Sequence, residues 1–207
     1  YPPPILSYAF EGGMWEKRSE LRCLDREGRY LPRLSYAFRE TQDHALSVLR
    51  EMARYSLDGI ALLYNRRPPY IMYEQPLIDG FKNTHGQDPR ELPEDDRNWL
   101  RYRANVMTDF MRRVRAELDV VAREQGREPI HLTACVLGKV DDNMYFGLDT
   151  GIWVKEGLID TLIPYSPAPL AMPIASDIWS DPGQVQPFVD MVRGTNCGLS
   201  MNVMPRD

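Results

Sequence analysis

Residues 58–68 read Asp-Gly-Ile-Ala-Leu-Leu-Tyr-Asn-Arg-Arg-Pro, and this stretch decides the fold class. An apolar run from Gly59 to Tyr64 stands between turn-forming residues and a polar segment that ends in proline. Apolar side chains at consecutive positions place hydrophobic groups on both faces of a strand. The pattern is typical of a parallel strand in a sheet that helices cover.

Amphipathic segments lie on either side of this run. The preceding segment, Thr41 to Tyr55, carries apolar residues at helical spacing, and Thr41 is a suitable N-cap. The longest predicted helix, about Asp96 to Gln125, has one apolar stripe and stops at Gly126. The stripe consists of Trp99, Tyr102, Val106, Phe110, Val114, Leu118 and Val121. Its charged residues, among them Arg101, Arg112 and Arg115, are predicted to face solvent.

Four more apolar runs and two shorter helices continue the alternation. The runs are Ile5 to Phe10, Ile130 to Leu137, Thr161 to Pro164 and Gly198 to Val203, and the helices lie at 150–156 and 181–193. Strands that alternate with helices predict an α/β protein of the (β/α)8 TIM-barrel type. Because such barrels typically need roughly 250 residues, we expect one domain, residues 1–207, that holds an incomplete barrel. The long segment from Arg66 to Glu94 is expected to be one large loop.

An open doubly wound sheet is the alternative architecture. It would usually carry a glycine-rich turn after its first strand, and Phe10-Glu11-Gly12-Gly13 is not a dinucleotide fingerprint. No phosphate-binding loop occurs elsewhere, so we predict no cofactor. The chain starts without a methionine, which leads us to expect a piece of a longer protein whose further barrel segments lie outside it.

Composition narrows the classes of partner. The net charge of −5 is spread along the chain and predicts no nucleic-acid partner. No apolar run approaches the roughly 18 residues that span a bilayer, so we expect a soluble protein without a membrane partner. The full-length protein could be secreted or periplasmic. The scattered cysteines and histidines fit no zinc spacing, and we predict buried thiols and no metal.

Polar residues that follow the predicted strands are the candidate site, because the active side of a barrel is the carboxyl end of its strands. Aromatic rings stack on sugar rings, and planar polar groups bond pairs of hydroxyls, so these residues suit a carbohydrate ligand. The candidate substrate-binding residues are Tyr64, Asn65, Arg66, Asp141, Tyr165, Trp179 and Asn202. The loop after the second run adds Tyr70, Tyr73, Glu74 and Asp79, and ordinary loop packing is the alternative role for its tyrosines.

Four motifs resemble bacterial proteins of the glycosyl hydrolase-like family 10 group. They are Arg33-Leu-Ser-Tyr-Ala-Phe38, the 58–68 stretch, the helix from Trp99 to Val114, and Asp149 to Tyr165 with its Trp153, Glu156-Gly157 and Pro164. They occur in the order of that group and touch most of residues 30–205. The resemblance implies a TIM barrel related to glycoside hydrolases, with a catalytic aspartate in the second motif. Here that position is Leu63, which cannot act as acid, base or nucleophile.

Two carboxyl groups are needed for glycoside hydrolysis, roughly 5 to 10 Å apart across the bond. The candidates are Glu11, Glu74, Asp141 and Asp142, and we prefer Glu74 as general acid and Asp142 as its partner. The alternative interpretation is that these residues are ordinary solvated carboxylates in loops. The first functional hypothesis is a glycoside hydrolase-like enzyme that acts on a polysaccharide or oligosaccharide.

A non-catalytic carbohydrate-binding barrel is the second hypothesis, and Leu63 favours it. A barrel isomerase or aldolase acting on a phosphorylated sugar is the weakest. It would need a phosphate site or a Schiff-base lysine within a strand, and Lys139 lies just past one.

Overall fold

The structure is a computed structural model that describes residues 13–65, 68–165 and 182–201. Its centre is a four-stranded parallel sheet in the order β3-β4-β5-β6, which is also the order of the strands along the chain. The strands are β3 (Gly59–Leu63), β4 (His131–Leu137), β5 (Thr161–Tyr165) and β6 (Gly198–Leu199). The α/β class is therefore confirmed, with parallel strands where four of the five apolar runs predicted them. The run from Ile5 to Phe10 lies outside the described residues.

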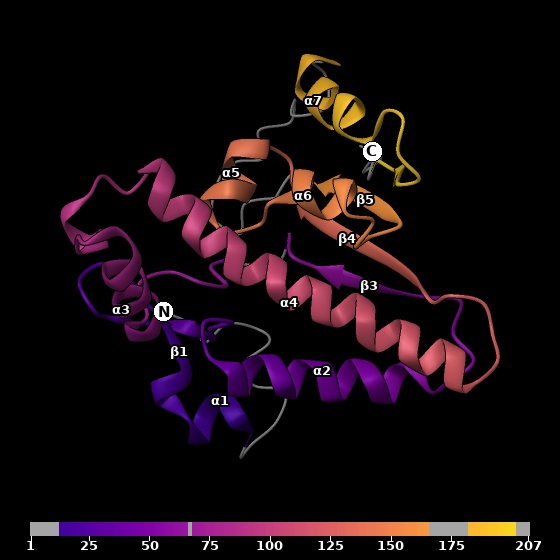
Figure 1. Cartoon of the computed structure of the whole chain (residues 1–207), viewed down its shortest axis with the longest axis horizontal. Helices are drawn as coiled ribbons and strands as arrows, with labels where there is room; N and C mark the ends of the chain where they lie inside the picture. Colours follow the sequence, from indigo (N-terminus) through magenta and orange to yellow (C-terminus); the bar gives the residue numbers. More distant parts are fainter. Residues whose placement is uncertain (1–12, 66–67, 166–181, 202–207) are drawn as a thin grey trace, which may run out of the picture.

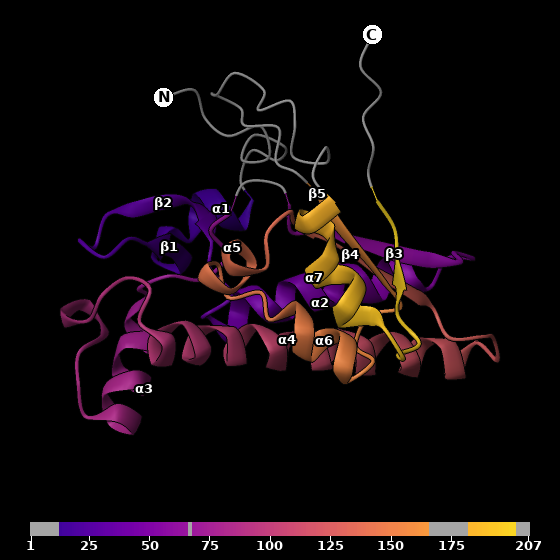
Figure 2. The same ribbon diagram turned by 90° about the horizontal axis from the view of Figure 1, so that it is seen from above.

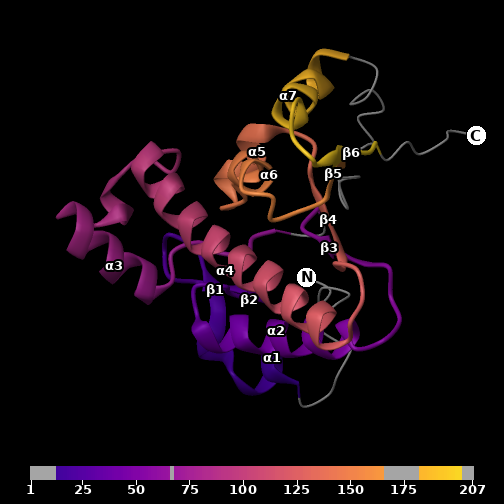
Figure 3. The ribbon, with the colours of Figure 1, turned by 45° about the vertical axis from the view of Figure 1, so that its right-hand side comes forward.

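Helices cover one face of this sheet (Figure 3). They are α2 (Arg39–Ala53), α4 (Arg97–Glu124), α6 (Thr150–Lys155) and α7 (Pro182–Val192). α4 is the longest, and it runs beside α2 and across the sheet in both Figure 1 and Figure 2. Alternate strand residues, among them Ile60, Leu132 and Leu162, are buried against these helices, whereas Gly59, Ala61 and Leu63 on the opposite face of β3 are exposed.

α4 has the ends and the stripe that its sequence predicts. The Asp96 carboxylate accepts hydrogen bonds from the amides of Asn98 and Trp99, 3.0 Å each, and so satisfies two free N–H groups of the first turn. Gly126 follows the C-cap at a φ of +60°, which glycine adopts without strain. The buried stripe includes one charged residue, Arg103, four positions after Trp99.

Two expectations about local structure are wrong, and one element was not predicted. The segment from Arg66 to Glu94 is not one loop, because it contains α3 (Gln75–His85) and a short 3-10 helix (Pro89–Glu91). The N-cap of α2 is Phe38, whereas Thr41 is buried inside the helix. An antiparallel hairpin was also not predicted, formed by β1 (Arg22–Leu24) and β2 (Tyr30–Leu34). It follows α1 (Met14–Lys17) and a 3-10 turn at Ser19–Leu21.

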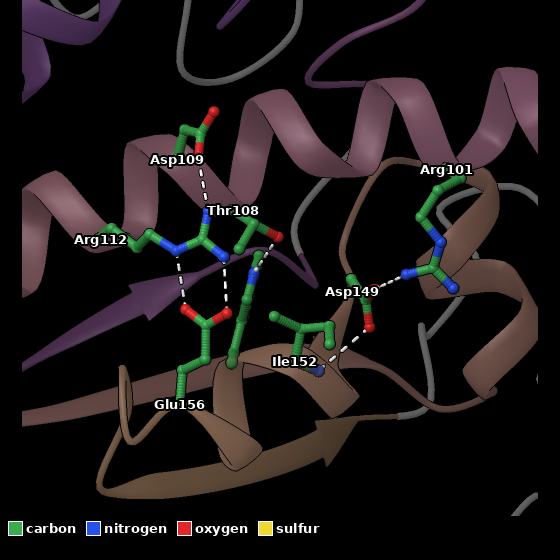
Figure 4. A network of polar contacts seen from close by, with 8 residues as sticks. Arg101, Thr108, Asp109, Arg112, Asp149, Ile152 and Glu156 are labelled. Carbon is green, nitrogen blue, oxygen red and sulfur yellow. Dashed lines mark hydrogen bonds and ion pairs between the residues drawn. The ribbon is translucent and has the colours of Figure 1, made fainter.

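The arginines on the outer side of α4 do not simply face solvent. Arg112 forms two hydrogen bonds with Glu156, the C-cap of α6, at 2.6 and 2.7 Å, and Arg101 pairs with Asp149, the N-cap of α6 (Figure 4). Between them the buried indole of Trp153 donates to the Thr108 hydroxyl, at 3.2 Å. These contacts fix α6 along α4, and α6 leads directly into β5.

Candidate functional site

The carboxyl ends of β3, β4 and β5 define the candidate site. Beyond β3 the chain stays beside β4, because the Asn65 amide donates to the Cys135 carbonyl at 3.0 Å. On the other side of β4, Tyr165 is in register with Leu137. Asn65 and Tyr165 therefore flank the end of β4, about 10 Å apart if each strand spacing is about 4.8 Å. Both were predicted as substrate-binding residues, and their joint position follows from the sheet.

Asn65 has an unusual environment for an amide side chain. The residue is only 8% exposed, and its Oδ1 atom is buried without a hydrogen-bond partner among the described residues. A buried polar atom that lacks a partner is costly, and such atoms mark places where a ligand or water can bind. Leu63, two residues earlier, is 56% exposed at the end of β3.

Tyr64 does not open onto the loops as we expected. Its ring is buried on the helix side of the sheet, 5.4 Å from the ring of Trp153 and 5.3 Å from that of Tyr70. Its hydroxyl contacts the sulfur of Met111 at 3.2 Å, and burial raises its pKa well above the usual range. The strand alternation that exposes Leu63 turns Tyr64 inward, so its contribution is to packing.

Glu74 lies in the interior and not in an open loop, which corrects its expected placement. It directly precedes α3, and its carboxylate oxygens accept from the amides of Leu24 at 3.1 Å and Met72 at 2.9 Å. Burial raises the pKa of this carboxyl group, while the two amide hydrogen bonds oppose the rise. Glu74 thus ties the β1–β2 hairpin to the segment after β3. Its catalytic role remains a prediction.

Asp141 and Asp142 lie in the first turn of α5 (Val140–Tyr145), immediately after β4, and both are exposed. Asn143 holds this helix onto the strand end: its fully buried side chain accepts from the Leu137 amide and donates to the carbonyls of Leu137 and Lys139. The sequence placed Asn143 after the strand but could not assign this role. The predicted site residues Arg66, Trp179 and Asn202 lie outside the described residues.

Sequence reasoning missed a buried arginine close to these loops. Arg103 is 1% exposed, and its Nη1 group donates to the Ile71 carbonyl and contacts the Met72 sulfur. Its position on the apolar stripe of α4, one turn after Trp99, was the available signal.

Three further features of the described residues bear on metal binding, thiol reactivity and membrane insertion. Within the described ranges, no group of three or more histidine, cysteine, aspartate or glutamate side chains is arranged to hold a metal ion. Cys23 and Cys197 are buried and Cys135 is half-buried, all three as free thiols. No helix in the described part of the chain combines the length and the apolar composition that crossing a membrane requires.

No model of a protein family matches the chain, and no curated protein matches it significantly.

Proposed function

We propose that this chain binds carbohydrate at the carboxyl ends of β3, β4 and β5. The observation that carries the proposal is the Oδ1 atom of Asn65, which has no partner among the described residues and is buried at one side of β4 with Tyr165 at the other. A carbonyl oxygen accepts hydrogen bonds from sugar hydroxyls. Tyr165 is 5% exposed, so it borders the site without offering a free ring face. Leu63 stands at the strand end where the family resemblance implies a carboxylate, which favours binding without hydrolysis.

We also propose that the sheet is part of a (β/α)8-type barrel. Strand order that follows chain order, with the helices on one face, is the arrangement that a barrel repeats eight times. The opposite face of β3 would then line the barrel interior. Further barrel segments of the same full-length protein would complete it.

Hydrolysis is the second candidate function, and one observation favours it. Burial raises the pKa of Glu74, the direction that a general acid needs in order to hold its proton near neutral pH. Asp142, exposed in the first turn of α5 beyond β4, would be its partner. Against this reading, both oxygens of Glu74 already accept hydrogen bonds from backbone amides.

The test is binding of the protein to a panel of neutral and acidic oligosaccharides, with release of reducing ends measured for each one that binds. Asn65→Leu removes the unpartnered oxygen with little change of volume, and Asn83→Leu, at an exposed position of α3, is the matched control. We expect Asn65→Leu to weaken binding at least about tenfold, as loss of one strong hydrogen bond does.

Binding to no oligosaccharide, or binding that Asn65→Leu leaves intact, would overturn the proposal. Release of reducing ends that Asp142→Asn or Glu74→Gln abolishes, with binding retained, would establish hydrolysis instead.

A further inference from the structure

Arg103 is a buried guanidinium without an acidic partner. No ion pair joins it to any carboxylate in the described part of the chain, although four other arginines of α4, Arg101, Arg112, Arg113 and Arg115, each have one. Arginine keeps its charge inside proteins, and an unpaired buried charge is unfavourable. Burial lowers the pKa of Arg103, in line with this cost.

Three aromatic rings surround the guanidinium carbon of Arg103. Its distance to the ring centre is 5.3 Å for Trp99, 5.7 Å for Tyr145 and 5.9 Å for Tyr73. We call these four residues the Arg103 cluster. The ring faces attract the cation and offset part of the cost of burial, but they accept none of its N–H groups in a normal hydrogen bond.

The inner part of the cluster holds three buried polar atoms without a hydrogen-bond partner among the described residues. They are Arg103 Nε, Trp99 Nε1 and the Tyr73 hydroxyl. Burial raises the pKa of Tyr73, although the charge of Arg103 and the nearby Trp99 N–H group lower it, so the phenol keeps its proton at neutral pH. Arg103 Nε and the Tyr73 hydroxyl are therefore donors without an acceptor among the described residues, whereas the Trp99 N–H group is directed at the Tyr73 oxygen. Donors gathered around a cation match an oxyanion.

The nearest acidic groups have other partners. Both oxygens of Glu74 accept from backbone amides, and Glu94 accepts from the Tyr145 hydroxyl at 2.9 Å. Glu94 is exposed and Tyr145 is partly exposed, so this pair forms the outer layer of the cluster. Tyr145 is the partly exposed member of the cluster, with contacts to Arg103 on one side and Glu94 on the other.

We propose that the Arg103 cluster binds the carboxylate group of a small acidic ligand. A guanidinium presents two parallel N–H groups to a carboxylate, and the Tyr73 hydroxyl adds a neutral donor beside it. The cluster is built from α4, α5 and the segment after β3, and it shares no residue with the Asn65 and Tyr165 site. The proposal can therefore be tested independently of carbohydrate binding at the strand ends.

The test is the thermal unfolding midpoint of the protein, measured with increasing sodium acetate or sodium glucuronate and compared with sodium chloride at equal ionic strength. A ligand that binds only the folded state raises the midpoint in proportion to its occupancy. We expect acetate to raise it more than chloride does. A tighter effect of glucuronate would identify a sugar acid, and equal effects would identify the carboxylate alone.

Tyr73→Phe is the decisive variant, because it removes one donor and keeps the ring. We expect apparent acetate affinity to fall at least about tenfold in Tyr73→Phe, while the ligand-free protein becomes no less stable. Tyr102→Phe is the matched control, since its ring also stacks near Trp99 but its hydroxyl lies against Gly80. Arg103→Met should abolish the effect of acetate on the unfolding midpoint. If Arg103→Met does not fold, the result for Tyr73→Phe tests the proposal. Equal midpoint shifts with acetate and chloride, or an unchanged acetate effect in Tyr73→Phe, would overturn the proposal.

Discussion

Glu74 shows how one buried carboxylate can support a fold at a pH-dependent cost. Its two oxygens join the β1–β2 hairpin to the segment before α3, through the amides of Leu24 and Met72. Because burial raises its pKa, the folded state binds a proton more tightly than the unfolded chain does. Stability from this group is therefore fully present below the usual glutamate pKa and is lost as the pH rises through the folded-state value.

Glu74→Gln should destabilise the protein by about 1–3 kcal/mol at low pH, because an amide can accept only one of the two backbone N–H groups. The difference from the wild type should shrink as the pH rises, since only the wild type carries the buried charge. Urea unfolding between pH 4.5 and 8 measures this, with Glu51→Gln at an exposed position of α2 as control. A difference that stays constant with pH would contradict the linkage.

At the scale of elements, two glycines with positive φ allow the cost of backbone strain to be compared with the cost of overpacking. Gly126 after α4 has a φ of +60° and nothing within 4 Å of an added Cβ atom. Gly147 after α5 has a φ of +79°, and its added Cβ atom would lie 2.7 Å from the Ile71 side chain. Both positions require a left-handed backbone, but only Gly147 is also packed against a neighbour.

Gly126→Ala should therefore cost about 1–2 kcal/mol, the usual penalty for a left-handed backbone with a side chain. Gly147→Ala should cost about 1–3 kcal/mol more, because the methyl group also overpacks the contact with Ile71. Chemical denaturation of the two variants gives the comparison. Equal losses would show that Ile71 moves aside freely.

The sequence predicts these elements wherever local pattern and tertiary role agree. Strands β3, β4 and β5 and helix α4 are apolar where the sheet and its helices bury them. α3 was missed because proline and glycine usually interrupt helices. Here Pro76 lies in the first turn, where a proline is tolerated, and Gly80 makes room for the Tyr102 hydroxyl. Only contact with α4 explains that glycine, and a single sequence does not contain that contact.

The candidate site divides in the same way. Asn65 and Tyr165 could be predicted, because parallel strands bring their carboxyl ends to one edge of a sheet. The burial of Glu74 could not, since it depends on the hairpin at Leu24, fifty residues earlier in the chain. The inward direction of Tyr64 follows from strand alternation, but only once the end of β3 is fixed.

For the whole molecule, the two sides of α2 differ in a way that bears on association. One side faces α4 through ion pairs of Asp43 with Arg113 and of Arg50 with Glu117. The other side exposes Val48 at 43% and Met52 at 41%, and Tyr55 continues the stripe just past the helix. β3, which follows α2, pairs with β4 on one side only within the described residues. Exposed apolar stripes and unpaired strand edges promote association.

We therefore expect the 207-residue chain to associate with itself as its concentration rises, and Met52→Lys to reduce this association. Lysine in place of Met52 interrupts the stripe at its centre, and a surface substitution of this kind changes stability by only about 0.5 kcal/mol. Sedimentation velocity across a range of concentrations measures the effect. Val120→Lys, at a similarly exposed apolar position on α4, is the control and should leave association unchanged. A monodisperse monomer that melts cooperatively at every concentration would show that the exposed side of α2 and the edge of β3 do not drive association.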